Sequence, residues 1–201
     1  TSAEVSDGDT SNDGTLSLAF TASEATTNFA VEDITVTNGT LSDFAAGLGS
    51  TYTATFTPTS DGATTINVAG GAFTDASDNT NTAATQFNWT YDGTAPTLSS
   101  VSIASDNSTT TQAVENDVVT LTLTASEAIS TPDVTFESGG ATITNTLVTY
   151  TNTLGTNTWT AAYTANASDT FGAVTFSIAY SDTAGNAATA VTTTTNSSSV
   201  S

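Results

Sequence analysis

An internal repeat is the feature that most constrains what this chain can fold into. Four landmark segments occur twice, in the same order, and their spacing drifts by only a few residues. The first landmark reads FTASEA in one copy and LTASEA in the other. The segments are residues 20–25, 33–36, 52–56 and 73–79 in the first copy, and residues 123–128, 133–136, 159–163 and 180–186 in the second. Self-similarity at a domain-length period indicates two homologous domains.

Apolar and polar residues alternate with period two through both copies, which predicts β-strands. Tyr52, Ala54 and Phe56 are one such apolar face. The first copy holds about seven such segments, counting an opening strand at Ala3 and Val5. The dipeptide at residues 38–39 (Asn-Gly) predicts a tight hairpin. Strong helix formers are scarce because Lys, Arg and Met are absent. The chain is therefore predicted to be all-β.

Seven short strands in about 100 residues, with turn residues between them, is typical of an immunoglobulin-like (Ig-like) sandwich. Residues 92–96 (DGTAP) have the Gly and Pro expected of a linker between two such domains. We therefore expect two tandem Ig-like β-sandwiches, at residues 1–93 and 94–201. The second domain is expected to end in a Thr/Ser-rich C-terminal tail.

Four motifs give the chain a more specific resemblance. They are TASEA in both copies, DITVTNGT at residues 33–40, DTAGN at residues 182–186 and DGTAP at residues 92–96. With these motifs the chain resembles the tandem bacterial Ig-like repeats of large secreted adhesins and biofilm-associated surface proteins. Two departures are Asp78, where the second copy has Gly185, and the lack of a closing DGTAP-like segment in the second domain. The resemblance implies an extracellular location, secreted or at the cell surface, and calcium at the joints between repeats.

The charge of the chain excludes several classes of function. It has 20 acidic residues and no Lys, Arg, His or Cys, which gives a formal net charge of -20. Binding to nucleic acid or to an anionic membrane surface has no electrostatic basis, and no apolar run is long enough for membrane insertion. Catalysis lacks an imidazole or amine base. A pair of carboxylates, as in glycosidases, is the remaining route, and two compact sandwiches offer little room for its cleft. We expect no enzyme.

The acidic residues gather in turns, and Ig-like topology predicts which turns meet. Loops after the second and sixth strands lie at the pole where the preceding linker enters. Asp92, Glu127 and Asp182 are therefore expected to converge at the joint and to bind structural Ca²⁺, which prefers six to eight oxygen ligands. The wider set of candidate ligands is Asp92, Glu127, Asp182, Asn186, Glu24, Asp75 and Asp78. The alternative is that Asp and Asn occupy these turns for backbone reasons alone.

Three functions remain open at this point. The first is a structural and adhesive module of a cell-surface stalk or adhesin, made rigid by calcium at the interdomain joint. The second is a subunit of an extracellular filament, in which residues 187–201 pair with a sheet edge of an identical subunit. The third is a carbohydrate-binding module, although Trp89 and Trp159 lie in alternating strands and are expected in the cores. The partners expected are neighbouring Ig-like repeats or identical subunits, with surface glycans or proteins as further candidates.

Overall fold

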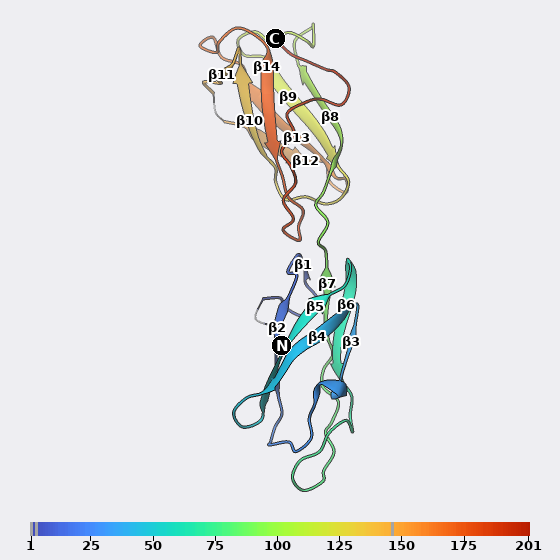
Figure 1. Cartoon of the computed structure of the whole chain (residues 1–201). Coiled ribbons are helices and arrows are strands. Elements are labelled where there is room, and N and C mark those ends of the chain that lie inside the picture. Colours follow the sequence, from blue (N-terminus) through green and yellow to red (C-terminus); the bar gives the residue numbers. More distant parts are fainter. Residues whose placement is uncertain (1, 3, 146) are drawn as a thin grey trace. The chain divides into compact units, whose positions relative to one another are not determined.

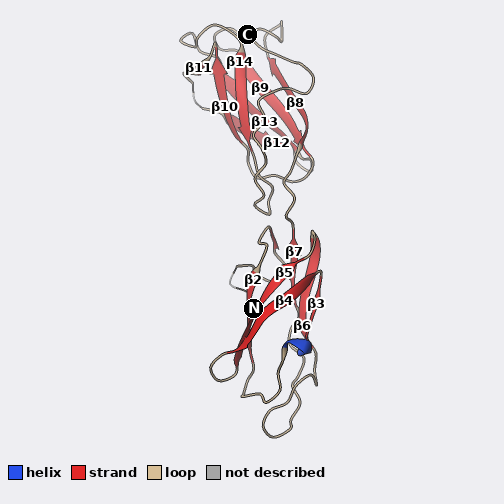
Figure 2. Ribbon diagram, viewed as in Figure 1, coloured by secondary structure: helices blue, strands red, loops and turns tan. Residues whose placement is uncertain are grey.

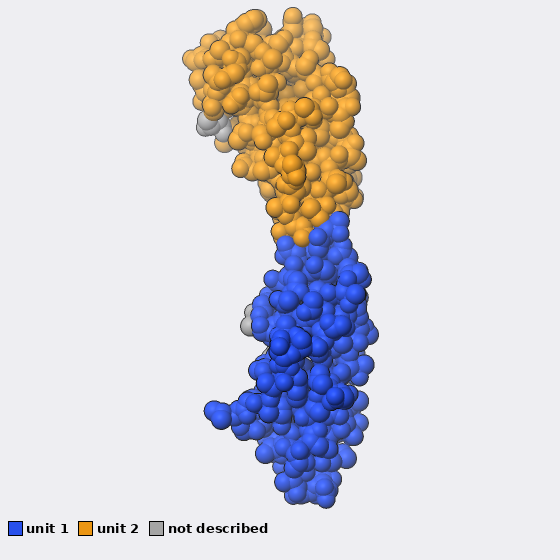
Figure 3. Space-filling model, in the orientation of Figure 1, with its two compact units in different colours: residues 1–94 blue, residues 95–201 orange. Residues whose placement is uncertain are grey.

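The chain forms two compact units, which Figure 3 colours separately. The computed structural model describes residues 2, 4–145 and 147–201. Unit 1 is Thr1–Thr94 and unit 2 is Ala95–Ser201. Almost all regular structure is β-strand, which confirms the predicted all-β class, and the helix among the described residues is a single 3-10 turn (Figure 2). No helix in the described part of the chain combines the length and the apolar character needed to cross a bilayer.

Unit 1 contains two β-sheets (Figure 1). One sheet has three strands in the order β2-β5-β4, and the other has four in the order β1-β7-β6-β3. The elements are β1 (Thr10–Ser11), β2 (Leu16–Thr21), η1 (Val31–Asp33), β3 (Ile34–Thr37), β4 (Gly39–Ala46), β5 (Thr51–Pro58), β6 (Gly62–Val68) and β7 (Phe87–Tyr91).

The core of unit 1 comes from the alternating residues that the sequence pattern predicts. In β5, Tyr52, Ala54 and Phe56 are buried while Thr51, Thr53 and Thr57 are exposed. Trp89 in β7 is only 2% exposed and meets the ring of Phe56 edge-on. Side chains of both sheets therefore share one apolar layer, as in a β-sandwich.

Unit 2 likewise contains one four-stranded sheet and one three-stranded sheet (Figure 1). Its four-stranded sheet has the order β12-β13-β9-β8, and its three-stranded sheet has the order β11-β10-β14. The elements are β8 (Leu98–Ser105), β9 (Val118–Ala125), β10 (Asp133–Ser138), β11 (Ala141–Thr142), β12 (Thr149–Asn152), β13 (Thr158–Thr164) and β14 (Val174–Ala179). In β9 every second residue is buried, so both units are Ig-like sandwiches.

The predicted hairpin at Asn38 and Gly39 is wrong, although the chain does turn there. Asn38 has a positive φ of 53°, but β3 pairs with β6 and β4 pairs with β5, in two different sheets. The Asn38 side chain donates hydrogen bonds to the carbonyl oxygens of Ser60 and Gly62. The turn is therefore a corner between sheets, tied to the neighbouring β5–β6 turn.

The predicted opening strand at Ala3 and Val5 lies partly outside the described residues, and Ser2 beside it forms an isolated bridge with Leu18. Ala3 lies outside the described residues, and Val5 is buried but belongs to no strand. The first strand among the described residues is β1, which pairs parallel with β7. Val5 contributes to the core by its apolar side chain alone.

The Thr/Ser-rich C-terminal segment is packed against its own unit. Val191 forms a bridge with Ile178 of β14, and the Thr195 amide donates to the Val101 carbonyl at 2.9 Å. Val200 is 1% exposed and belongs to the core of unit 2. The segment that the filament alternative would donate to a neighbour is thus already paired within unit 2.

Candidate metal centre

The loop after β14 is closed by the carboxylate of Asp182. Oδ1 of Asp182 accepts hydrogen bonds from the amides of Gly185 (2.7 Å) and Asn186 (2.8 Å), and Oδ2 accepts one from the Asn186 side chain (2.8 Å). Gly185 has a φ of 104°, which suits glycine. Asp182 is 2% exposed. A carboxylate has about four lone-pair positions, so Asp182 can serve its own loop and still offer an oxygen to an ion.

Glu127 and Asp92 come from two other segments. Glu127 follows β9, in a loop anchored by the Ser126 amide, which donates to the Thr97 carbonyl at 2.8 Å. Asp92 follows β7, and its backbone amide donates to the Ser11 carbonyl at 3.0 Å. Both acidic side chains are half-buried. Strand ends therefore position each residue by backbone hydrogen bonds.

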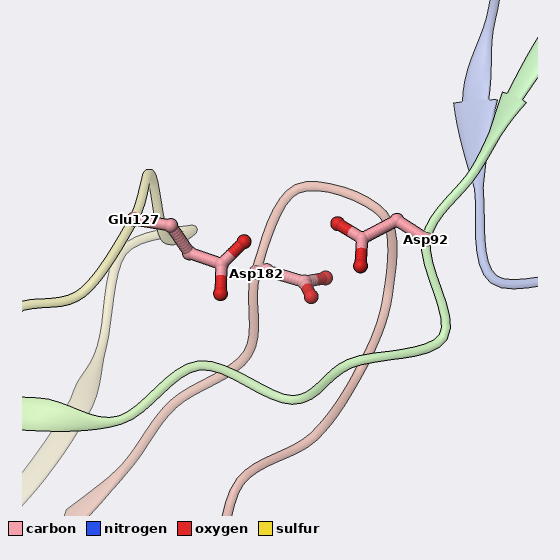
Figure 4. A group of neighbouring side chains, drawn as sticks. All are labelled: Asp92, Glu127 and Asp182. Atoms are coloured by element: carbon pink, nitrogen blue, oxygen red, sulfur yellow. The ribbon is translucent and has the colours of Figure 1, made fainter. Parts of the chain in front are cut away.

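The three acidic residues predicted to converge are brought together. One carboxylate oxygen from each of Asp92, Glu127 and Asp182 lies within 4.8 Å of the others. Figure 4 shows the three side chains directed toward a common space from three separate stretches of ribbon. We call these residues the carboxylate trio.

The carboxylate trio has the chemistry of a site for a hard divalent cation. Two unit charges at this separation repel by roughly 3 kcal/mol at an effective dielectric constant near 20. The sequence contains no Lys, Arg or His side chain to offset this repulsion. Oxygens bound to one Ca²⁺ at 2.3–2.6 Å lie at most about 5 Å apart, and the observed separation falls inside that limit.

The remaining candidate metal ligands are Asn186 in unit 2 and three acidic residues in unit 1, and their hydrogen bonds and exposure differ. Asn186 is half-buried beside Asp182, to which its amide donates. In unit 1, Asp75 closes its loop as Asp182 does, accepting from the amides of Ser77 and Asn79. The Asn79 side chain and amide hold the pKa of Asp75 below its ordinary value. The described residues of unit 1 include no third acidic group that joins Asp75 in such a cluster.

Glu24 and Asp78 are exposed. Asp78 has a φ of 65° and stands where unit 2 has Gly185, which also has a positive φ. The turn therefore requires a left-handed backbone at this position, which Asp tolerates better than most residues. The metal role of Glu24, Asp75 and Asp78 stays a prediction.

A hollow in unit 1 was not anticipated from the sequence. It has a volume of about 470 Å³ and is lined mainly by the end of β2, the loop that holds Asp75 and several aromatic rings. The rings of Phe20 and Phe73 lie 6.0 and 4.7 Å from that of Phe29. The signal was an excess of Phe in the first copy, which carries Phe20 and Phe73 where the second carries Leu123 and Tyr180.

The two tryptophans do not form an exposed platform for sugars. Trp89 is buried in the core of unit 1, and Trp159 is half-buried against the core of unit 2. Aromatic stacking on a sugar requires an open ring face, which the buried Trp89 does not provide. The carbohydrate-binding alternative therefore gains no support from these residues.

Two Ig-like sandwiches define the fold class, and comparison with known proteins shows which family the first of them resembles. Residues 1–91 match the family model described as the bacterial Ig-like domain. Residues 1–91 are therefore similar to the bacterial Ig-like domain, in agreement with the resemblance seen in the motifs. The curated proteins contain no significant match to the sequence.

Several solved structures are similar to the whole chain at low identity. The D00-D0 domain of intimin is 14% identical, with a TM-score of 0.34, covering 94% of this chain and 96% of that one. A chimeric titin Z1Z2 with an exogenous decorin peptide is 12% identical, with a TM-score of 0.31, covering 100% and 94%. Tandem Ig repeats of Dlar are 12% identical, with a TM-score of 0.25, covering 93% and 91%.

Proposed function

We propose that this chain is a structural module of an extracellular, cell-surface or adhesive protein, in which Ca²⁺ fixes the linker between the two Ig-like units. The similarity of residues 1–91 to the bacterial Ig-like domain supports the structural role. The carboxylate trio is the single observation that carries the calcium part of the proposal. Such a module transmits position and force, and it needs no catalytic group.

In this proposal Ca²⁺ holds the linker to unit 2, an arrangement that we call the calcium clasp. Asp92 belongs to the linker after β7, whereas Glu127 and Asp182 belong to loops of unit 2. An ion shared by all three ties the linker to unit 2, because moving the linker would remove a ligand from the metal. Ca²⁺ suits three flexible loops better than Mg²⁺, which demands a near-ideal octahedron.

The filament alternative has less support. It needs residues 187–201 to leave their own unit, and Val200 would then lose its place in the core. A strand that already pairs within its own unit must lose these contacts, at a cost in free energy, before it can pair with a neighbour. The stalk or adhesin module is therefore the better account.

The test compares thermal unfolding in millimolar Ca²⁺ and in chelator for the wild type, Glu127→Gln and Glu24→Gln. A metal that binds only the folded state stabilises it by about 2.7 kcal/mol at 100 times its Kd. For a domain of this size we expect a rise of roughly 10 °C in the Tm of unit 2. Glu127→Gln should lose most of this rise, because it removes one ligand charge without changing shape.

Glu24→Gln is the matched control, since Glu24 occupies the corresponding place in unit 1 and is exposed. It should keep the full calcium response. Asp182→Ala is a poor substitute for Glu127→Gln, because it also breaks three hydrogen bonds of its own loop. An equal Tm in Ca²⁺ and in chelator for the wild type would refute the calcium clasp.

A further inference from the structure

The carboxylate of Asp61 holds the beginning of the linker. Asp61 lies in the turn between β5 and β6, and the linker follows β7. Oδ1 of Asp61 accepts a hydrogen bond from the Gly93 amide at 2.7 Å, and Oδ2 accepts one from the Thr94 hydroxyl. The Thr94 hydroxyl and the Gly93 amide hold the pKa of Asp61 below its ordinary value, so the acceptor is ionised at neutral pH. One carboxylate thus binds two consecutive residues of the linker.

The register of the sheet places Asp61 next to the linker. Gly62 of β6 pairs with Tyr91 of β7, so Asp61 and the linker leave the ladder at the same end. The turn that carries Asp61 is held on both sides, because the Asn38 side chain donates to the carbonyl oxygens of Ser60 and Gly62. Asp61 is therefore supported by the body of unit 1, independently of the linker that it binds.

The linker also passes close to the surface of unit 1 at Gly93. A Cβ atom at this position would lie 2.5 Å from Oη and 2.9 Å from Cζ of Tyr91, too close for any side chain unless the ring moved. The Tyr91 ring is packed edge-on against Trp89, with 5.9 Å between the ring centroids. Glycine therefore allows the backbone to pass the Tyr91 ring and reach Asp61.

Thr94 connects Asp61 to a residue of the carboxylate trio. Its hydroxyl donates to Asp61, while its backbone amide donates to Oδ1 of Asp92 at 3.2 Å. The Asp92 amide in turn donates to the Ser11 carbonyl at 3.0 Å. From this stretch of linker the Asp92 side chain points toward the other two members of the trio (Figure 4). Asp61 can therefore influence the direction of the Asp92 carboxylate without belonging to the trio.

We propose that Asp61 is a positioning residue for the candidate calcium site, acting on Asp92 through Thr94. This inference rests on the calcium site proposed above. Groups that orient a metal ligand typically contribute about 10–100-fold to metal affinity. By holding residues 93 and 94, Asp61 fixes the backbone that carries Asp92, so less motion is lost when the ion binds. The connection from the ion then continues past the linker, because Asp61 belongs to the body of unit 1.

Thr94→Val tests this role, because it removes the hydroxyl that reaches Asp61 and leaves every charge of the chain in place. Calorimetric titration of the full chain with Ca²⁺ measures the Kd. The Kd should rise by about tenfold in Thr94→Val, whereas Thr94→Ser, which keeps a hydroxyl, should retain the affinity of the wild type. Thr97→Val is the matched control and should also bind like the wild type, since Thr97 is exposed and its amide, not its hydroxyl, donates to Ser126.

A second measurement needs no metal. In chelator, the NMR order parameter of the Gly93 amide should fall from about 0.85 in the wild type toward about 0.6 in Thr94→Val. Thr94→Ser and Thr97→Val should leave it unchanged. An equally ordered Gly93 in Thr94→Val would overturn the positioning role, because the hydroxyl would not be holding the linker.

The titration separates this role from the calcium site itself. A wild type that binds Ca²⁺ with the same Kd as Thr94→Val would overturn the role of Asp61 and leave the calcium site standing. A wild type that binds no Ca²⁺ would refute the calcium site, and the positioning role with it.

Discussion

Several carboxylates in this protein accept hydrogen bonds from groups of their own turns. Asp75 and Asp182 each accept two backbone amides and one Asn side chain within the same loop. Asp117 likewise accepts from the Val114 amide and the Asn107 side chain. What distinguishes Asp182 is its surroundings, because two further carboxylates lie against it. The turn role and the proposed metal role are therefore compatible in one side chain.

These hydrogen bonds predict how stability depends on pH. Hydrogen bonds from Ser17 and Ser2 lower the pKa of Glu4 from 4.5 to about 2, and the Val114 amide and Asn107 hold that of Asp117 below its ordinary value. Unfolded chains bind protons to these groups at higher pH than folded chains do. In chelator, the free energy of unfolding should therefore fall as the pH drops from about 4.5 to about 2.

Urea unfolding at a series of pH values checks this expectation. Asp117→Asn should make the fall with pH shallower, because one group with a lowered pKa is removed. Acidification also relieves repulsion among the 20 acidic groups. If the free energy of unfolding rose steadily down to pH 2, that relief would outweigh the hydrogen bonds of the carboxylates.

At the scale of elements, the C-terminal segment is a structural part of unit 2 rather than an appendage. The Val174 amide donates to the Val200 carbonyl at 2.9 Å, and the Ile103 amide donates to the Ser198 hydroxyl at 2.9 Å. The segment thereby contacts both β14 and β8, which lie in different sheets. It closes the sandwich where neither sheet alone would cover the core.

Val200→Ala should therefore lower the free energy of unfolding of unit 2 by about 2 kcal/mol, through lost burial and a residual cavity. Val114→Ala is the matched control, since Val114 is 61% exposed and should change stability by less than about 0.5 kcal/mol. Chemical denaturation followed by Trp159 fluorescence measures both. Equal effects of the two substitutions would show that the C-terminal segment does not contribute to the core in solution.

At the scale of the whole molecule, residues 92–96 are the covalent joint between two units with separate cores. A short linker keeps two domains close without fixing their angle. Pro96 restricts the residue before it to extended conformations, and the Gly93 amide donates to the Asp61 carboxylate at 2.7 Å, which holds the start of the linker against unit 1. The proposed calcium clasp would remove part of this freedom.

Small-angle scattering should accordingly show a narrower range of interdomain arrangements in Ca²⁺ than in chelator. An equal concentration of Mg²⁺ controls for ionic strength, which also screens the charge of -20. Asp92→Asn in Ca²⁺ should scatter like the wild type in chelator, because the linker would lose its ligand. Identical scattering of the wild type under all three conditions would remove the mechanical role of the ion.

The sequence by itself determined the all-β class, the Ig-like sandwich and most buried positions. Leu16, Leu18, Ile66 and Val68 are buried as their alternation predicts. Alternation is a local property, since successive side chains of a strand point to opposite faces. The topology of the fold also sufficed to predict that Asp92, Glu127 and Asp182 approach one another, because it assigns each loop to a pole.

Only the tertiary structure decided which strands pair and what each edge contacts. Asn38 and Gly39 have the same local preferences in a hairpin and in a corner between sheets, and the choice depends on the partners β5 and β6. The hollow beside Phe20 also depends on segments distant in the chain, because its lining runs from residue 20 to residue 84. Such contacts join residues far apart in sequence, so no local pattern of residues specifies them.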